Sequence, residues 1–215
     1  MSRVYGVMGE SGSGKTTSMR ELDPATTFYI DCDKKGLSWK GWRNQYSFEK
    51  HNYMATDSIS TVQQLLGKIS SQDNMKHIKV VVIDTLNGLM VADEVHRMKE
   101  KGYDKWVDMA QCVWELLDSL YSFREDLTII VLCHSQTQKE DDGYTFTRIK
   151  TSGKKLDKLN VESKLTTVLH AVVKDGKYVF LTHANNSTAK TPLGAFQEDE
   201  IPNNIVDVIK ALEEY

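Results

Sequence analysis

Short apolar runs and longer amphipathic segments alternate along the chain, and their periods distinguish strands from helices. The apolar runs, several of them rich in β-branched residues, occupy residues 3–8, 27–30, 78–84 and 127–133. Runs of this kind are typical of strands that a parallel sheet buries on both faces. Apolar residues spaced three and four apart predict helices at residues 60–69, 106–120 and 205–212, and residues 86–101 also favour a helix. The pattern predicts an α/β fold with a mostly parallel central sheet flanked by helices.

Polar signals mark where these elements begin, turn or give way to loops. Ser60 and Gln63 have the spacing of a capping box, which predicts the start of the first long helix. Asp175 and Gly176 separate two apolar runs and predict a C-terminal β-hairpin. Residues 135–161 are polar and carry no sustained apolar face, so they predict a long loop or an exposed hairpin. A connection of this length in a compact domain tends to serve a function.

The stretch from Gly9 to Thr16 reads GESGSGKT and matches the phosphate-binding loop pattern G-x-x-x-x-G-K-[ST]. It follows a predicted strand and precedes a segment, residues 16–21, that can open a helix. Glycines let backbone N–H groups converge on phosphate oxygens, Lys15 adds positive charge, and the Thr16 hydroxyl can bind Mg²⁺. A helix starting here would direct the positive end of its dipole at the same anion. The predicted nucleotide-binding residues are Gly9, Glu10, Ser11, Gly12, Ser13, Gly14, Lys15, Thr16 and Thr17.

Length and composition limit the class of protein. A chain of 215 residues suits one domain, and we expect residues 1–215 to form a single one. No apolar run approaches the roughly 18 residues of a membrane helix, and the N-terminus lacks the apolar stretch of a signal peptide, so we expect a soluble, cytoplasmic protein. The formal charge of −3 gives no overall attraction to nucleic acid. Three cysteines without a C-x-x-C pair predict buried, reduced thiols.

Acidic and polar residues follow three of the predicted strands. Asp84 ends an apolar strand, where a nucleotide-binding sheet needs a carboxylate to hold Mg²⁺ opposite the Thr16 hydroxyl. Asp31 and Asp33 leave another strand two residues apart, so in extended chain they point the same way, and one of them can poise water for hydrolysis. His134, with the two polar residues after it, follows a third strand and can report the state of the γ-phosphate.

The order of these motifs resembles that of RecA-like ATPases. The segments that carry the resemblance are Gly9–Thr16, Tyr29–Asp33, Val80–Thr85 and Val131–Gln136. More narrowly, Ala189–Phe196 and Ile201–Asn203 look like phage nucleotide-binding proteins of the RecA-like P-loop class, whose relatives include Sak-type single-strand annealing proteins. The resemblance implies a single RecA-like ATPase domain that binds ATP and Mg²⁺ and acts in phage DNA recombination or annealing in the host cytoplasm.

The resemblance also implies roles for individual residues. Asp33 matches the position of a catalytic glutamate and would poise the attacking water, but its side chain is one methylene shorter, so Glu10 and Asp31 stay open as alternatives. His134 falls at the family's γ-phosphate sensor. Lys190 is the best match for a basic residue that completes the site of a neighbouring subunit. The family therefore implies a homo-oligomer, either a ring or a filament.

The segment after the sensor position contacts single-stranded DNA in that family, and here it holds the densest basic stretch of the chain. Tyr144 and Phe146 lie nearby and can stack on bases. A solvated run of charges is the alternative interpretation. The candidate nucleic-acid residues are Arg148, Lys150, Lys154, Lys155 and Lys158, and Lys164 ends the stretch.

Two other functions fit parts of the sequence. A small-molecule kinase would use Asp31 and Asp33 for Mg²⁺ and substrate, although the arginines that usually clamp the phosphates do not cluster in this chain. A nucleotide-binding interaction module would show little turnover. Strand order separates the RecA-like ATPase from the small-molecule kinase. RecA-like proteins place a strand between those ending at Gly9 and Asp84, and most such kinases do not. Trp39 and Trp42 are expected in the core rather than on a partner surface or a base-stacking platform.

Overall fold

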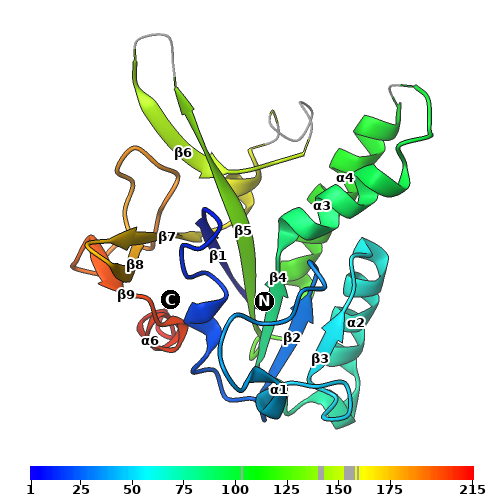
Figure 1. Cartoon of the computed structure of the whole chain (residues 1–215). Helices are drawn as coiled ribbons and strands as arrows, with labels where there is room; N and C mark the ends of the chain where they lie inside the picture. The colour runs from blue at the N-terminus through cyan, green and yellow to red at the C-terminus, as the bar shows by residue number, and fades with distance from the viewer. Residues whose placement is uncertain (103, 140–142, 153–157, 159) are drawn as a thin grey trace.

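The computed structural model describes residues 1–102, 104–139, 143–152, 158 and 160–215. Within these ranges a nine-stranded sheet runs through the molecule in the order β3-β2-β4-β5-β1-β7-β8-β9, and β6 pairs with β5 (Figure 1). All neighbours from β3 to β7 are parallel, whereas β8 and β9 add antiparallel strands. The strands are β1 (Arg3–Gly9), β2 (Thr27–Asp31), β3 (Tyr53–Ala55), β4 (Val80–Asp84), β5 (Thr128–Lys139), β6 (Thr145–Ile149), β7 (Thr167–Lys174), β8 (Lys177–Leu181) and β9 (Glu200–Pro202). The predicted α/β fold, with its C-terminal hairpin, is confirmed.

Strand order separates the two enzyme classes that the sequence suggested. β5 lies between β1, which ends at Gly9, and β4, which ends at Asp84. In register, Gly9 is level with His134, and Asp84 is level with Leu132. This is the inserted strand of the RecA-like arrangement, and it argues against the kinase arrangement, in which the two strands are adjacent.

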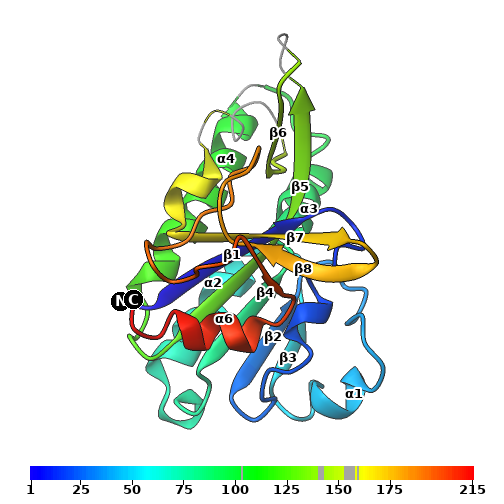
Figure 2. The same cartoon turned by 90° about the vertical axis from the view of Figure 1, so that its left-hand side faces the viewer.

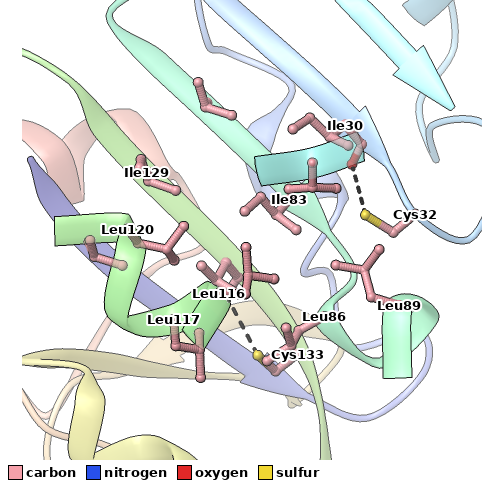
Figure 3. Packing of buried hydrophobic residues seen from close by; sticks show 14 of the residues in the cluster. Ile30, Cys32, Ile83, Leu86, Leu89, Leu116, Leu117, Leu120, Ile129 and Cys133 are labelled. Atoms are coloured by element: carbon pink, nitrogen blue, oxygen red, sulfur yellow. Dashed lines mark hydrogen bonds between the residues drawn. The ribbon is translucent and has the colours of Figure 1, made fainter. Parts of the chain in front are cut away.

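Helices cover both faces of the sheet (Figures 1 and 2). Strand side chains alternate between two cores: Met8, Ile83 and Val131 face one, while Val7 and Val82 face the other. Cys32 and Cys133 lie in the first core among the aliphatic residues that Figure 3 labels, and Cys112 is only partly buried. The α-helices are α1 (Trp42–Gln45), α2 (Ile59–Ser71), α3 (Leu86–His96), α4 (Asp104–Ser119) and α6 (Ile205–Ala211), and the 3₁₀ turns are η1 (Thr17–Met19), η2 (Asp73–Met75), η3 (Leu120–Ser122) and η4 (Val161–Lys164).

Two local predictions were wrong in detail. The cap of α2 is Ser58, whose hydroxyl accepts from Thr61 N at 3.3 Å, so the cap lies two residues before the predicted Ser60. The segment after the phosphate-binding loop is not an α-helix but the short turn η1. One α-type bond, from Ser18 N to the Gly14 carbonyl at 2.9 Å, precedes bonds of 3₁₀ type. A single turn carries little macrodipole, so backbone N–H groups and Lys15 must provide most of the attraction for phosphate.

The first half of the polar segment 135–161 forms an exposed hairpin, which is one of the two predicted forms. β5 continues past Cys133 and pairs antiparallel with β6, from Ser135 opposite Ile149 to Lys139 opposite Thr145. We call residues 135–149 the arm, of which 140–142 lie outside the described residues. The arm projects beyond the central sheet in both views (Figures 1 and 2).

The two tryptophans of residues 34–52 pack less deeply than expected. Trp39 and Trp42 are half-buried against the second core, and their rings meet Tyr29 and Tyr53 respectively.

No helix in the described part of the chain is long and apolar enough to span a membrane.

Candidate nucleotide-binding site

The phosphate-binding loop joins the carboxyl end of β1 to η1, and its glycines are required by the backbone. Gly12 and Gly14 have φ angles of 80° and 91°, a region that residues with a Cβ rarely adopt. At Gly9 the constraint is space, because a Cβ there would lie 2.4 Å from Ser13 Oγ and 2.6 Å from the Ala171 carbonyl oxygen. The loop therefore follows a tight path against β7.

Lys15 lies inside this loop. Its side chain is 6 % exposed, and Nζ donates to the carbonyl oxygens of Gly9 at 2.8 Å and Glu10 at 2.7 Å. Burial lowers the pKa of Lys15, and the Asp84 carboxylate opposes this effect. The ammonium group is thus held at the centre of the loop by neutral acceptors that a phosphate oxygen can replace.

Asp84 and Thr16 meet as the sequence predicted, although 68 residues separate them. Thr16 Oγ1 donates to Asp84 Oδ2 at 2.8 Å, and the Tyr29 hydroxyl donates to the same oxygen at 2.6 Å. Burial raises the pKa of Asp84, partly offset by these two hydrogen bonds. The other oxygen, Oδ1, is buried without a hydrogen-bond partner in the described residues.

These oxygens fit Mg²⁺. Carboxylate and hydroxyl oxygens are the hard donors that this ion prefers, and the unpartnered Oδ1 of Asp84 has coordination capacity to spare. No group of three or more His, Cys, Asp or Glu side chains gathers as a metal site among the residues described. Thr16 and Asp84 would therefore hold the ion together with phosphate oxygens and water, as Mg²⁺ usually requires.

Asp84→Asn should stabilise the fold while removing Mg²⁺ binding. The folded-state pKa of Asp84 is raised above the unfolded value of about 3.9, so its charge destabilises the folded state at neutral pH. We expect the melting temperature at pH 7 to rise, because asparagine removes the buried charge. The gain should disappear as pH falls and Asp84 becomes protonated. Thermal unfolding of the parent and the variant at pH 7 and pH 4 measures the gain in stability and its loss. An equal shift in melting temperature at the two pH values would contradict the assignment.

The two carboxylates after β2 have different environments. Asp31 is buried, and its Oδ2 accepts from Gly36 N at 2.7 Å and from the Tyr53 hydroxyl at 2.8 Å. Asp33 is more accessible, accepting from Thr85 Oγ1 at 3.1 Å and Lys35 Nζ at 2.6 Å. Asp31 therefore shapes the loop after β2, whereas the side chain of Asp33, which is 16 % exposed, lies just beyond the carboxyl end of that strand.

Asp33 and His134 line one cavity, together with Asn87 and Gly88 at the start of α3. His134 is half-buried, and burial, followed by the charge of Lys15, lowers the pKa of His134. The imidazole is therefore neutral at pH 7 and can both donate and accept a hydrogen bond. The predicted water-poising residue and the predicted sensor thus face a shared space. Glu10, the remaining alternative for water, is exposed on the loop.

Lys190 pairs through its backbone with the first half of β7, level with the middle of β1 rather than with the loop. Its backbone forms a β-bridge with Val168, which is level with Gly6, three residues before the loop begins. The side chain is partly buried; burial lowers the pKa of Lys190, and the charge of Glu162 opposes this effect. Its action on a neighbouring subunit stays a prediction.

The predicted nucleic-acid residues divide into two groups. Lys150 and Lys158 are exposed, whereas Arg148 Nε lies 3.8 Å from Glu162. Lys164 forms an ion pair with Asp118 and lies 4.3 Å above the ring of Trp114. Lys154 and Lys155 lie outside the described residues. Tyr144 and Phe146 stack with ring centroids 6.2 Å apart on the arm.

Sequence reasoning missed Asn87, which links the site to the arm. Its side-chain Oδ1 accepts from His134 N at 2.7 Å, and its Nδ2 donates to the Lys150 carbonyl oxygen at 2.7 Å. The signal that could have found it is its polarity, because it is buried among the apolar residues that begin α3. A buried amide needs partners of its own.

Comparison with known proteins agrees with this geometry. The family model described as AAA domain matches residues 1–193, a range that includes the phosphate-binding loop, Asp84 and the arm. No curated protein matches the chain. Because the family match covers far more than half of the sequence, and the fold and loop accord with it, the chain belongs to the AAA domain family of P-loop ATPases.

Proposed function

We propose that this protein is an Mg²⁺-dependent ATPase that acts on single-stranded DNA in recombination or strand annealing. The observation that carries the ATPase assignment is the 2.8 Å contact between Thr16 and Asp84, which assembles a metal-binding pair beside Lys15. The resemblance of Ala189–Phe196 to phage RecA-like proteins supports the DNA pathway and a phage origin.

Each residue of the site has a distinct task in this proposal. Lys15 leaves its two carbonyl partners to neutralise phosphate charge, and the loop amides hold the triphosphate in place. Asp33 accepts a hydrogen bond from the attacking water, and neutral His134 senses the γ-phosphate across the shared cavity. Mg²⁺, bound by Thr16 and Asp84, would neutralise charge on the phosphates. Lys35 forms an ion pair with Asp33 and so competes with water for the Asp33 carboxylate. This competition supports a slow basal rate of ATP hydrolysis.

The arm is well placed to bind a single strand. It projects beyond the sheet (Figure 1) and carries the stacked Tyr144 and Phe146. Exposed lysines lie on the same hairpin, Lys139 at the end of β5 and Lys150 directly after β6. Aromatic stacking combined with phosphate contacts is the usual mode of binding single strands without sequence preference. A solvated charge run would not need the aromatic pair.

Two connections allow nucleotide and arm to influence each other. Asn87 bonds to both His134 and Lys150, and so links the sensor position to the end of the arm. On the other side, a cavity is lined by loop residues 10–13 and by Thr137 and Thr147 near the base of the arm. Phosphate binding at the loop would therefore bias the position of the arm, and DNA on the arm would bias the loop.

ATP hydrolysis measured with and without single-stranded oligonucleotide tests the proposed function. We expect stimulation by the oligonucleotide. Binding with little turnover in either condition would favour the interaction module, and phosphoryl transfer to a small molecule would restore the kinase alternative.

Replacing Lys154, Lys155 and Lys158 with alanine should weaken oligonucleotide binding and flatten its salt dependence. On a single strand each phosphate contact contributes about 0.7 to the slope of log K against log salt, so three lost contacts should remove about 2. ATP affinity should not change, because none of these residues belongs to the nucleotide site. Lys210→Ala, an exposed lysine on α6, is the control. A triple variant with the parental slope would show that these lysines are ordinary surface charge.

A further inference from the structure

An exposed aromatic residue lies directly against the phosphate-binding loop. A Cβ built on Gly14 would be 2.7 Å from Tyr178 Cδ1, so the ring of Tyr178 packs onto the loop backbone. Half of the Tyr178 surface is nevertheless exposed, as is half of its cross-strand neighbour Val173, at 50 % and 52 % respectively. Figure 2 shows the β7–β8 hairpin that carries both residues beside the segment that follows β1. The result is an open apolar surface next to a site for a charged group.

A buried polar group occupies the same position. Asn203 is 6 % exposed, and its Oδ1 would lie 3.2 Å from a Cβ on Gly14. Its Nδ2 is buried and has no hydrogen-bond partner among the described residues. An unsatisfied buried donor is unfavourable, and native structures rarely keep one without a reason. Asn203 thus offers a donor to a ligand beside the ring of Tyr178.

Hydrogen bonds hold this corner in place. Arg20 NH1 donates to the carbonyl oxygens of Thr17 at 3.2 Å and Asn203 at 3.3 Å. Asn204 Nδ2 donates to Glu21 Oε2 at 2.9 Å. The junction between β9 and α6 is therefore hydrogen-bonded to η1 and the residues after it. These bonds give Asn203 a defined position relative to the phosphate-binding loop.

We propose that Tyr178 and Asn203 form the subsite for the nucleobase. The triphosphate occupies the loop, the base stacks on the exposed face of Tyr178, and Asn203 Nδ2 donates to an acceptor on the edge of the base. A base offers an aromatic face for the ring of Tyr178 and acceptor atoms for Asn203 Nδ2. Phosphate binding uses neither of these two protein groups. This inference rests on the proposed nucleotide-binding function and adds how the protein recognises the rest of the nucleotide.

Competition between ATP and inorganic tripolyphosphate separates base recognition from phosphate recognition. Tyr178→Ala should weaken ATP binding by about fivefold to 150-fold, the range for loss of one stacked base, and leave tripolyphosphate affinity within about twofold. Tyr178→Phe should keep ATP affinity, because stacking needs the ring and not the hydroxyl. Asn203→Ala should weaken ATP binding by about 2- to 12-fold, the range for one hydrogen bond, again without an effect on tripolyphosphate.

Tyr215→Ala is the matched control, an exposed tyrosine at the C-terminus that should leave both affinities unchanged. Equal losses of ATP and tripolyphosphate in Tyr178→Ala would overturn the proposal, because the ring would then only shape the loop. Unchanged ATP affinity in that variant, or a loss in Tyr178→Phe as large as in Tyr178→Ala, would overturn it as well. Failure of the parent protein to bind either ligand would instead refute the nucleotide-binding function on which the proposal rests.

Discussion

Lys15→Ala should lower the affinity for ATP by about tenfold to more than a hundredfold, because it removes a charge-assisted contact worth roughly 1.5–3 kcal/mol. The contact is strong because Lys15 is buried in the loop and already has its ammonium group at the two carbonyls that border the phosphate site. Unlike substitution of Tyr178, this change should weaken ATP and tripolyphosphate alike. Calorimetry or fluorescence titration with each ligand measures the difference.

The control for this variant is Lys79→Ala. Lys79 precedes β4, at the end of the sheet opposite the loop, and pairs with Asp126 on the surface. It removes the same charge from the protein, so any general electrostatic effect of net charge appears in both variants. If Lys15→Ala bound ATP with parental affinity, the assignment of the loop as the nucleotide site would be wrong.

Asp33→Asn should lower turnover by about a hundredfold or more while ATP still binds. Asparagine keeps the shape and can still accept from Thr85 Oγ1, but it cannot serve as a base toward water. Steady-state hydrolysis and equilibrium ATP binding, measured on the same preparation, give the two quantities.

Asp57→Asn is matched to this variant, since Asp57 lines the same cavity and pairs with Lys34 at 2.6 Å as Asp33 pairs with Lys35. Its turnover should stay within about twofold of the parent. Parental turnover in Asp33→Asn would transfer the role to Glu10, because the hydrogen bonds of Asp31 to Gly36 and Tyr53 assign that carboxylate to the structure of the loop.

Local sequence determined the parts of this protein whose cause is local. The glycines and Lys15 define the phosphate-binding loop because the need for positive φ and for a charge acts within eight residues. Apolar runs identified the buried strands, and Asp175-Gly176 identified the β7–β8 hairpin, because burial on both faces and a two-residue turn leave their mark in consecutive residues. Even Asp84 could be predicted, since it ends such a strand.

The tertiary structure alone decided which of these parts meet. Periodicity reports that a strand is buried but not which strand lies beside it, so only the fold placed β5 between β1 and β4. The fold also decided between the two predicted forms of the polar segment, a loop or an exposed hairpin, in favour of the hairpin. The segment after the loop forms a short turn instead of the expected helix, and Arg20 at its end donates a hydrogen bond to the Asn203 carbonyl oxygen, 183 residues away. No motif gave Asn87 or Tyr178 a role, and Asn203 was noticed only as the end of the segment Ile201–Asn203. Their roles depend on distances between residues far apart in sequence, and these distances exist only once the sheet has brought its edges together.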